Sequence, residues 1–264
     1  MAEDHETQFL ILMYHLISEA GSREEARYCC PPRKFSRHLT GLSSAGYTFV
    51  SLSEIRAHLD GRRPLPRNAV ALTFDDGFRN IYEQAFPLLS KYKVPATIFL
   101  VSGLIGKTNV WMANEGYPDR PMLTWDQVRE MQRNGIEIGG HTCTHPRLPA
   151  LDEEQAIREI AGCKEAIQEQ LGSEIHHFAY PYGALSEPVR AMVEQAGFQT
   201  ACSIHSGFNR AATDPFVLRR IEIKGTDSVR QFRWKVKFGK NQVGWAFSLK
   251  CQADRTAARI LQRR

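Results

Sequence analysis

The chain has 264 residues, 42% of them hydrophobic, and a formal net charge of +5. This hydrophobic content supports a full core and excludes an intrinsically disordered chain, and no continuous run of about 18 apolar residues predicts a transmembrane helix. Six cysteines occur without a C-x-x-C pair or a regular spacing, which argues against a zinc ribbon and a disulfide scaffold.

Strand and helix patterns alternate along the chain. Apolar runs predict strands at residues 9–14, 48–50, 70–74, 96–101, 136–138, 177–180, 198–203 and 218–223. Capping residues and terminal glycines predict helices at 35–45, 54–59, 80–92, 125–133, 153–171 and 187–195, the third bent near Pro87. The alternation predicts an α/β fold, a barrel of about seven parallel strands in a single domain over residues 9–225.

The residues with chemical potential follow the ends of predicted strands. They are His15, Asp75, Asp76, His141 and Tyr182. In a barrel of parallel strands the carboxyl ends meet on one face, whereas in an open sheet they would spread along an edge. No glycine-rich nucleotide-binding loop is present, so the barrel is favoured. The aperiodic segment 106–121 is expected to be a surface loop that could line a substrate groove.

An Asp-Asp-Gly sequence and a His-x-x-x-His pair together suggest a metal site. Asp75 and Asp76 end one strand, and His141 and His145 follow a later one. Each element alone has a simpler explanation, a turn for the first and a chance pair for the second. Together, one Asp and two His can hold a divalent cation with open positions, while the second Asp serves as a base.

Three motifs in this order resemble those of the NodB-homology polysaccharide deacetylases, carbohydrate esterase family 4. T-F-D-D-G at residues 73–77 and H-T-C-T-H at 141–145 match two of that family's motifs. A-Y-P-Y at 179–182 matches its R-x-P-Y motif except at the first position. The resemblance covers residues 9–223 and implies a distorted (β/α) barrel.

The resemblance also implies residue roles. Asp76, His141 and His145 would ligate the metal, Asp75 would be the general base, and the backbone N–H of Tyr182 would help to hold the oxyanion. Zinc is expected for a His₂Asp set with an open position, and cobalt, nickel or iron would fit the same ligands.

Two departures from the family pattern affect the expected mechanism. The Arg that orients the catalytic Asp is replaced by Ala179, so either another cation takes that role or the base is tuned differently. The downstream D-x-x-D-W and L-x-H motifs are absent. In the poly-N-acetylglucosamine deacetylase branch, where the motif order is permuted, the general-acid His lies on an N-terminal strand. Met13-Tyr14-His15 resembles that arrangement, so we expect His15, and not His205, to be the general acid.

The predicted activity is metal-dependent removal of an N-acyl group, most simply acetyl, from an amino sugar or glycan in polysaccharide or lipopolysaccharide biosynthesis. A deformylase, or another non-peptide C–N hydrolase acting on a lipid-linked sugar or small amide, would carry the same motifs. A catalytically inactive carbohydrate-binding domain is the third alternative, and Ala179 is its only support.

The C-terminal segment 226–264 is predicted to be a basic helix or tail. From Arg230 to the end it has ten Lys or Arg against one acid, Asp254. Such a segment could be a solvated or barrel-packing face, or could contact an anionic membrane or lipid phosphate. No nucleic-acid-binding motif accompanies it. Residues 1–8 are acidic and polar, unlike a secretory signal, so we expect a cytoplasmic protein, membrane-associated if the tail binds lipid.

Overall fold

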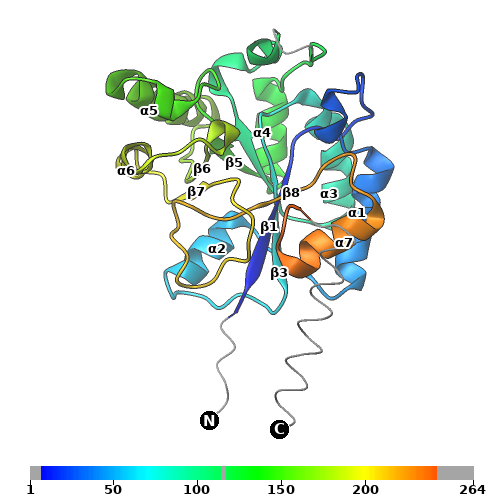
Figure 1. The fold of residues 1–264 in the computed structure, drawn as a ribbon. Coiled ribbons are helices and arrows are strands. Elements are labelled where there is room, and N and C mark those ends of the chain that lie inside the picture. The colour runs from blue at the N-terminus through cyan, green and yellow to red at the C-terminus, as the bar shows by residue number, and fades with distance from the viewer. Residues whose placement is uncertain (1–6, 114–116, 243–264) are drawn as a thin grey trace.

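The computed structural model describes residues 7–113 and 117–242, which form one curled parallel sheet surrounded by helices (Figure 1). The strands are β1 (Phe9–Tyr14), β2 (Thr48–Phe49), β3 (Ala69–Phe74), β4 (Thr97–Leu100), β5 (Glu137–Gly140), β6 (His177–Ala179), β7 (Thr200–Cys202) and β8 (Ile221–Glu222). Seven of them follow the order β7-β6-β5-β4-β3-β1-β8, and β2 pairs with the start of β3.

Helices connect the strands much as the sequence predicts. They are α1 (Pro32–Ser44), α2 (Leu52–Leu59), α3 (Phe86–Tyr92), α4 (Trp125–Arg133), α5 (Glu153–Leu171), α6 (Glu187–Gln195) and α7 (Val229–Phe238). Side chains of Ser51, Thr124 and Asp152 cap α2, α4 and α5, each within a capping box. The helix predicted at 80–92 is bent, because a π-helical turn, Ile81–Ala85, leads into α3 beside Pro87.

The segment from Leu218 to Glu222 joins the two edges of the sheet. Leu218 forms a parallel bridge with Cys202 at the end of β7. Ile221 and Glu222 then pair with Leu12 and Met13 of β1. This short connection makes the curled sheet a distorted (β/α) barrel, which confirms the predicted fold class.

Two apolar clusters show which strand faces point into the barrel. The inner cluster takes alternate residues from successive strands and from the joining segment, including Phe9, Ile11, Ala69, Ala71, Phe99, Ala179, Cys202 and Leu218. The intervening residues, including Leu10, Leu12, Val70 and Leu72, pack in the larger cluster with the helices. Strands buried on both faces explain the continuous apolar runs in the sequence.

The start of the predicted basic tail packs onto the barrel. Phe232 of α7 stacks on His38 of α1 with ring centroids 3.8 Å apart. Buried Lys235 donates to Asp227 over 2.6 Å. Residues 243–264, which carry the rest of the predicted tail, lie outside the described residues. Within the described part of the chain, no helix has the length and apolar character needed to span a bilayer, and every cysteine is free.

Candidate active site

The strand alternation places three site residues on the inward face at one end of the barrel. His15, Asp75 and His141 each lie one residue past the end of a strand, namely β1, β3 and β5. In each case the alternation of side chains along the strand turns this residue toward the inside of the barrel. Asp75 and His141 are almost completely buried. All three lie at carboxyl ends of parallel strands, where barrels carry their active sites.

Asp76, His141 and His145 converge as the sequence predicts. Their ligand atoms all lie within 4.8 Å of one another. The Nε2 atoms of His141 and His145 lie 3.4 and 3.3 Å from Oδ1 of Asp76. Nδ1 of His141 lies 2.7 Å from the carbonyl oxygen of Ala179, a contact that turns Nε2 toward the shared site.

The geometry of this triad fits a divalent metal ion. Two ligands bound at about 2.1 Å to one tetrahedral zinc ion lie about 3.4 Å apart, which matches both Asp–His separations. Burial lowers the pKa of His145 despite the neighbouring Asp76 carboxylate, so its imidazole is neutral, as a metal ligand must be. Burial would raise the pKa of Asp76, but the two imidazoles hold it far below its usual range.

Asp75 has a buried arginine partner, Arg220. Nη1 and Nη2 of Arg220 donate to the two carboxylate oxygens of Asp75 over 2.6 and 2.8 Å. The guanidinium also donates to Thr73 Oγ1 over 3.2 Å and to the Ser203 carbonyl over 2.9 Å. Burial alone would raise the pKa of Asp75, but Arg220, with a smaller contribution from His141, keeps it below its usual range. The Asp75 carboxylate is therefore ionised and fixed in orientation.

The backbone of the site adopts conformations that are uncommon for side-chain-bearing residues. Of six non-glycine residues with positive φ in the described chain, Asp76, Thr142, His145 and Tyr182 lie at this site. Next to Asp76, Gly77 has φ 81°, and a Cβ there would lie 2.9 Å from the Leu100 side chain. Such conformations persist where the surrounding structure enforces them, and they cluster at functional sites.

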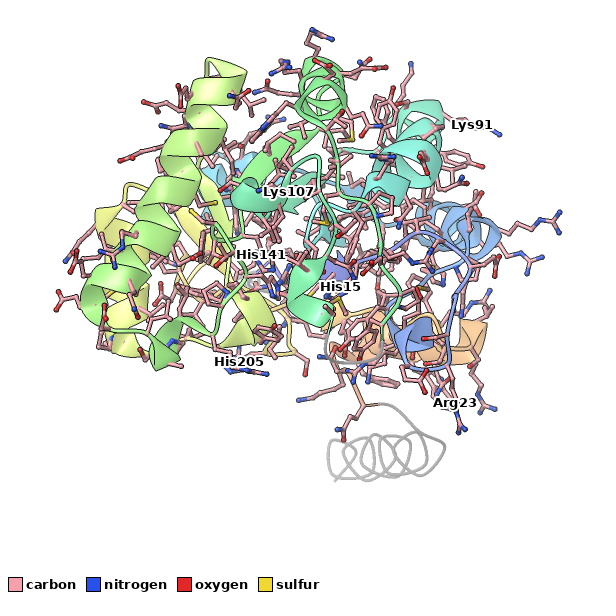
Figure 2. The ribbon with its side chains drawn as sticks, turned by 90° about the horizontal axis from the view of Figure 1, so that it is seen from above. His15, Arg23, Lys91, Lys107, His141 and His205 are labelled. Carbon is pink, nitrogen blue, oxygen red and sulfur yellow. The ribbon has the colours of Figure 1, made fainter. Side chains whose placement is uncertain are left out.

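A pocket of about 290 Å³ opens over these groups. His15 and Tyr182 line it, as expected, and so does Trp111 from the loop predicted to border a groove. The rings of Trp111 and Tyr182 contact the His145 ring at centroid distances of 4.7 and 4.6 Å. His205 is exposed and is not a lining residue; Figure 2 shows it near the edge of the molecule, with His15 and His141 nearer the centre.

Arg220 is the site residue that sequence reasoning missed. It was treated as part of a last strand, although a charged residue in a buried apolar strand is unusual and requires a partner. Its position two residues after inward-facing Leu218 also predicts an inward side chain. Ala179 itself contributes only its carbonyl, which accepts from His141.

Comparison with protein-family models finds a match for the central part of the chain. A model of the polysaccharide deacetylase family matches residues 62–201, more than half of the chain. Bacillus subtilis YxkH, provisionally named a polysaccharide deacetylase, is 29% identical over 213 residues, covering 81% of this chain and 70% of YxkH. The poly-beta-1,6-N-acetyl-D-glucosamine N-deacetylase of Staphylococcus aureus is 24% identical over 238 residues, covering 83% of this chain and 79% of its own.

Solved structures of similar fold superpose on most of this chain. The Streptococcus pyogenes deacetylase PplD, solved in complex with acetate, superposes with a TM-score of 0.75 at 26% identity, covering 88% of this chain and 99% of that one. IcaB from Ammonifex degensii superposes with a TM-score of 0.74 at 26% identity, covering 88% and 97%.

Proposed function

The chain belongs to the polysaccharide deacetylase family, and on that premise we propose that it is a metal-dependent N-deacetylase acting on an N-acetylated amino sugar within a glycan. One observation carries the proposal. The Asp76–His141–His145 triad and Asp75, which is paired with buried Arg220, line the same pocket. A ligand set beside a separate ionised base is the arrangement that amide hydrolysis needs.

The proposed cofactor is zinc, with cobalt, nickel or iron as ions that the same ligands would accept. Bound by Asp76, His141 and His145, the ion would polarise the amide carbonyl and make water more acidic. The protein then supplies the proton transfers. Asp75 accepts a proton from the attacking water, and its bidentate pairing with Arg220 keeps one orientation ready for that step.

Two further residues complete the proposed mechanism. His15 would donate a proton to the leaving amine, and its place in the pocket lining supports this role. The backbone N–H of Tyr182 would stabilise the oxyanion, a contribution that is commonly worth a few kcal/mol. The contact of the Tyr182 ring with His145, at a centroid distance of 4.6 Å, supports this role.

The substrate class follows from the relatives named above. We propose an N-acetylglucosamine-containing polymer or its precursor in polysaccharide or lipopolysaccharide biosynthesis. The test is product analysis after incubation with N-acetylated and N-formylated forms of the same amino-sugar oligomer. Release of acetate in preference to formate supports the proposal. Preferential release of formate would favour the deformylase alternative, and release of neither acid would favour an inactive binding domain.

We further propose a cytoplasmic protein that contacts an anionic membrane through its basic C-terminal region. The exposed side of α7 carries Arg230, Arg233 and Lys237, which supports this proposal. Replacing the three with Gln in the full chain should reduce co-sedimentation with anionic liposomes and leave that with neutral liposomes unchanged. Equal sedimentation of both proteins with anionic liposomes would contradict membrane contact through α7.

A further inference from the structure

Two loops from distant parts of the sequence line the pocket and contact each other, and we call them its two walls. The first wall is the segment 15–30 after β1, which contributes Arg27 and Tyr28 to the lining. The second wall is the segment 106–121 after β4, of which residues 106–113 and 117–121 are described, and it contributes Trp111 and Met112. The spacing between these walls determines what can reach the triad.

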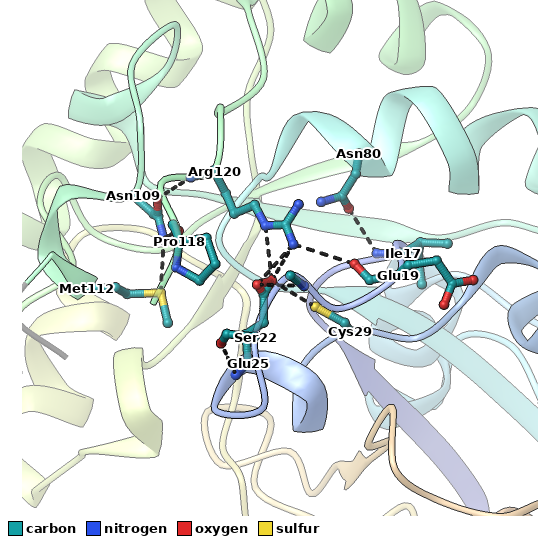
Figure 3. Close-up of polar contacts among 11 residues, drawn as sticks. Ile17, Glu19, Ser22, Glu25, Cys29, Asn80, Asn109, Met112, Pro118 and Arg120 are labelled. Carbon is teal, nitrogen blue, oxygen red and sulfur yellow. Dashed lines mark hydrogen bonds and ion pairs between the residues drawn. The ribbon is translucent and has the colours of Figure 1, made fainter. Parts of the chain in front are cut away.

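An ion pair between buried Glu25 and partly exposed Arg120 joins the two walls (Figure 3). Nη2 of Arg120 donates to both carboxylate oxygens of Glu25 over 2.5 and 2.9 Å, and Nε donates over 3.0 Å. Only 3% of Glu25 is exposed, so this carboxylate would be costly to bury without its partner. We call Glu25 and Arg120 the wall clamp.

Each partner of the wall clamp is fixed within its own wall. Glu25 also accepts from the Gly21 N–H over 3.3 Å and from the Cys29 thiol over 3.2 Å. On the other side, buried Asn109 accepts from the Arg120 backbone N–H over 2.6 Å. The Asn109 amide also donates to the Pro118 carbonyl and to the Met112 sulfur. A movement of either charged group would therefore move its whole loop.

The walls in turn contact the catalytic groups. The Tyr28 ring lies 5.2 Å from the His15 ring and 6.0 Å from that of Tyr117 in the second wall. Trp111 stacks on His145 at 4.7 Å. The wall clamp itself does not line the pocket. Glu25 and Arg120 therefore act on the lining rings of Tyr28 and Trp111 indirectly, through the two loops that carry them.

We propose that Glu25 and Arg120 are positioning residues that set the spacing of the pocket walls and so determine binding of sugar units next to the acetylated one. This inference rests on the proposed function. A bidentate guanidinium–carboxylate pair defines both distance and angle, which an apolar contact between two loops would not. A small acetyl ester needs only the triad and its immediate surroundings, whereas a sugar chain must also fit against the lining residues of both walls.

The experiment compares two substrates in clamp variants. Arg120→Met removes the guanidinium, Glu25→Gln keeps the shape but removes the charge, and Arg120→Lys keeps one charge without the bidentate geometry. Arg129→Met, which breaks the exposed Arg129–Asp126 pair on α4, is the matched control. Each protein is loaded with zinc and assayed with an N-acetylglucosamine oligomer and with 4-nitrophenyl acetate, and its melting temperature and zinc content are recorded.

We expect the loss of the wall clamp to affect the two substrates differently. In Arg120→Met and Glu25→Gln, KM for the oligomer should rise about tenfold or more, because small misplacements of binding groups have effects of this size. Turnover of 4-nitrophenyl acetate by the same variants should stay within about twofold of wild type. KM of Arg120→Lys for the oligomer should lie between those of wild type and Arg120→Met. The double variant, Glu25→Gln with Arg120→Met, should have a KM for the oligomer little higher than that of either single variant. A purely structural role would instead lower kcat for both substrates equally and leave both KM values unchanged.

Equal losses on both substrates, or an unchanged KM for the oligomer in a folded clamp variant, would overturn the inference. Glu25→Gln is the milder change and allows this comparison if Arg120→Met does not fold. A zinc-loaded wild type that hydrolyses neither substrate would contradict the proposed function instead. Calorimetric binding of the oligomer then decides the inference, because clamp variants should bind it more weakly than wild type and the control.

Discussion

At the scale of single residues, the partner of Asp75 is the main departure from the family motif. The motif places an Arg at position 179, where this chain has Ala179. Arg220 reaches the same carboxylate from the segment that joins β7 to β1, and none of its surface is exposed. A guanidinium that keeps the Asp75 carboxylate ionised is therefore supplied from another strand, as the proposed role of Asp75 as base requires.

Replacing Arg220 should impair turnover more than metal binding. In Arg220→Met, kcat should fall about 100-fold, the size of a general-base contribution, because Asp75 loses its fixed orientation. Arg220→Lys should recover part of the activity. Steady-state kinetics and zinc content measure the two effects, with exposed Arg219→Met as the control. Wild-type kcat in folded Arg220→Met would show that Asp75 needs no orienting partner.

The two candidate general acids differ in position, which makes them separable. His15 lines the pocket, whereas His205 is exposed and outside its lining. We expect His15→Ala to retain zinc and lose about 100-fold or more in kcat, and His205→Ala to remain close to wild type. The measurement is kcat for acetate release, with zinc content determined on the same samples. The opposite ranking of the two variants would assign the acid role to His205.

At the scale of elements, helix α5 supports the loop between His141 and His145. Oε2 of Glu159 accepts from the backbone N–H groups of Cys143 and Thr144 over 2.8 and 2.9 Å, and Oε1 accepts from the Thr144 hydroxyl over 2.6 Å. This loop includes Thr142 and His145, both with positive φ. Glu159 thus holds a strained backbone in the ligand-binding geometry.

Loss of the Glu159 carboxylate should weaken metal binding. Groups that support ligands in this way are commonly worth about 10–100-fold in metal affinity, so we expect a rise of that size in the zinc Kd of Glu159→Ala. Competition with a fluorescent chelator gives the Kd, and Glu169→Gln on the exposed side of α5 is the control. A zinc Kd equal to that of wild type would mean that the loop keeps its shape unaided.

Sequence patterns predicted elements well where one local signal decides them. α4 and α6 match the expected ranges, because Thr124 and Ser186 cap their starts and no strong competing signal is present. The Asp76–His141–His145 triad was also predicted, since both motifs follow strands whose ends meet. Arg220 and Glu159 were not, because their partners are distant in sequence and no short motif encodes that contact.

At the scale of the whole molecule, the barrel depends on packing that is sensitive to pH. His38 of α1 stacks on Phe232 of α7, and its Nδ1 lies 3.1 Å from the Tyr14 hydroxyl oxygen in a hydrogen bond. Burial lowers the pKa of His38 from 6.5 to about 3, with a smaller contribution from Lys34. Burial likewise lowers the pKa of His177 to about 4, despite the neighbouring Glu137.

These shifts predict acid destabilisation that begins near neutral pH. Below pH 6.5 His38 becomes protonated in the unfolded chain, whereas in the folded chain it stays neutral until about pH 3. Stability should therefore fall with decreasing pH in this window by about 1.4 kcal/mol per pH unit for this group. Urea unfolding between pH 4 and pH 7 should show a shallower slope for His38→Gln, with the His177 contribution remaining. Parallel pH profiles for the two proteins would contradict this assignment.

The central claim is that this chain deacetylates glycans with a metal held by Asp76, His141 and His145. The most direct measurement is acetate release from an N-acetylglucosamine oligomer by chelator-treated protein, titrated with zinc, for wild type and Asp76→Ala. We predict that wild-type activity returns in proportion to zinc up to one ion per chain, while Asp76→Ala neither binds zinc tightly nor recovers. Full activity of the metal-free wild type, or of Asp76→Ala, would contradict the claim.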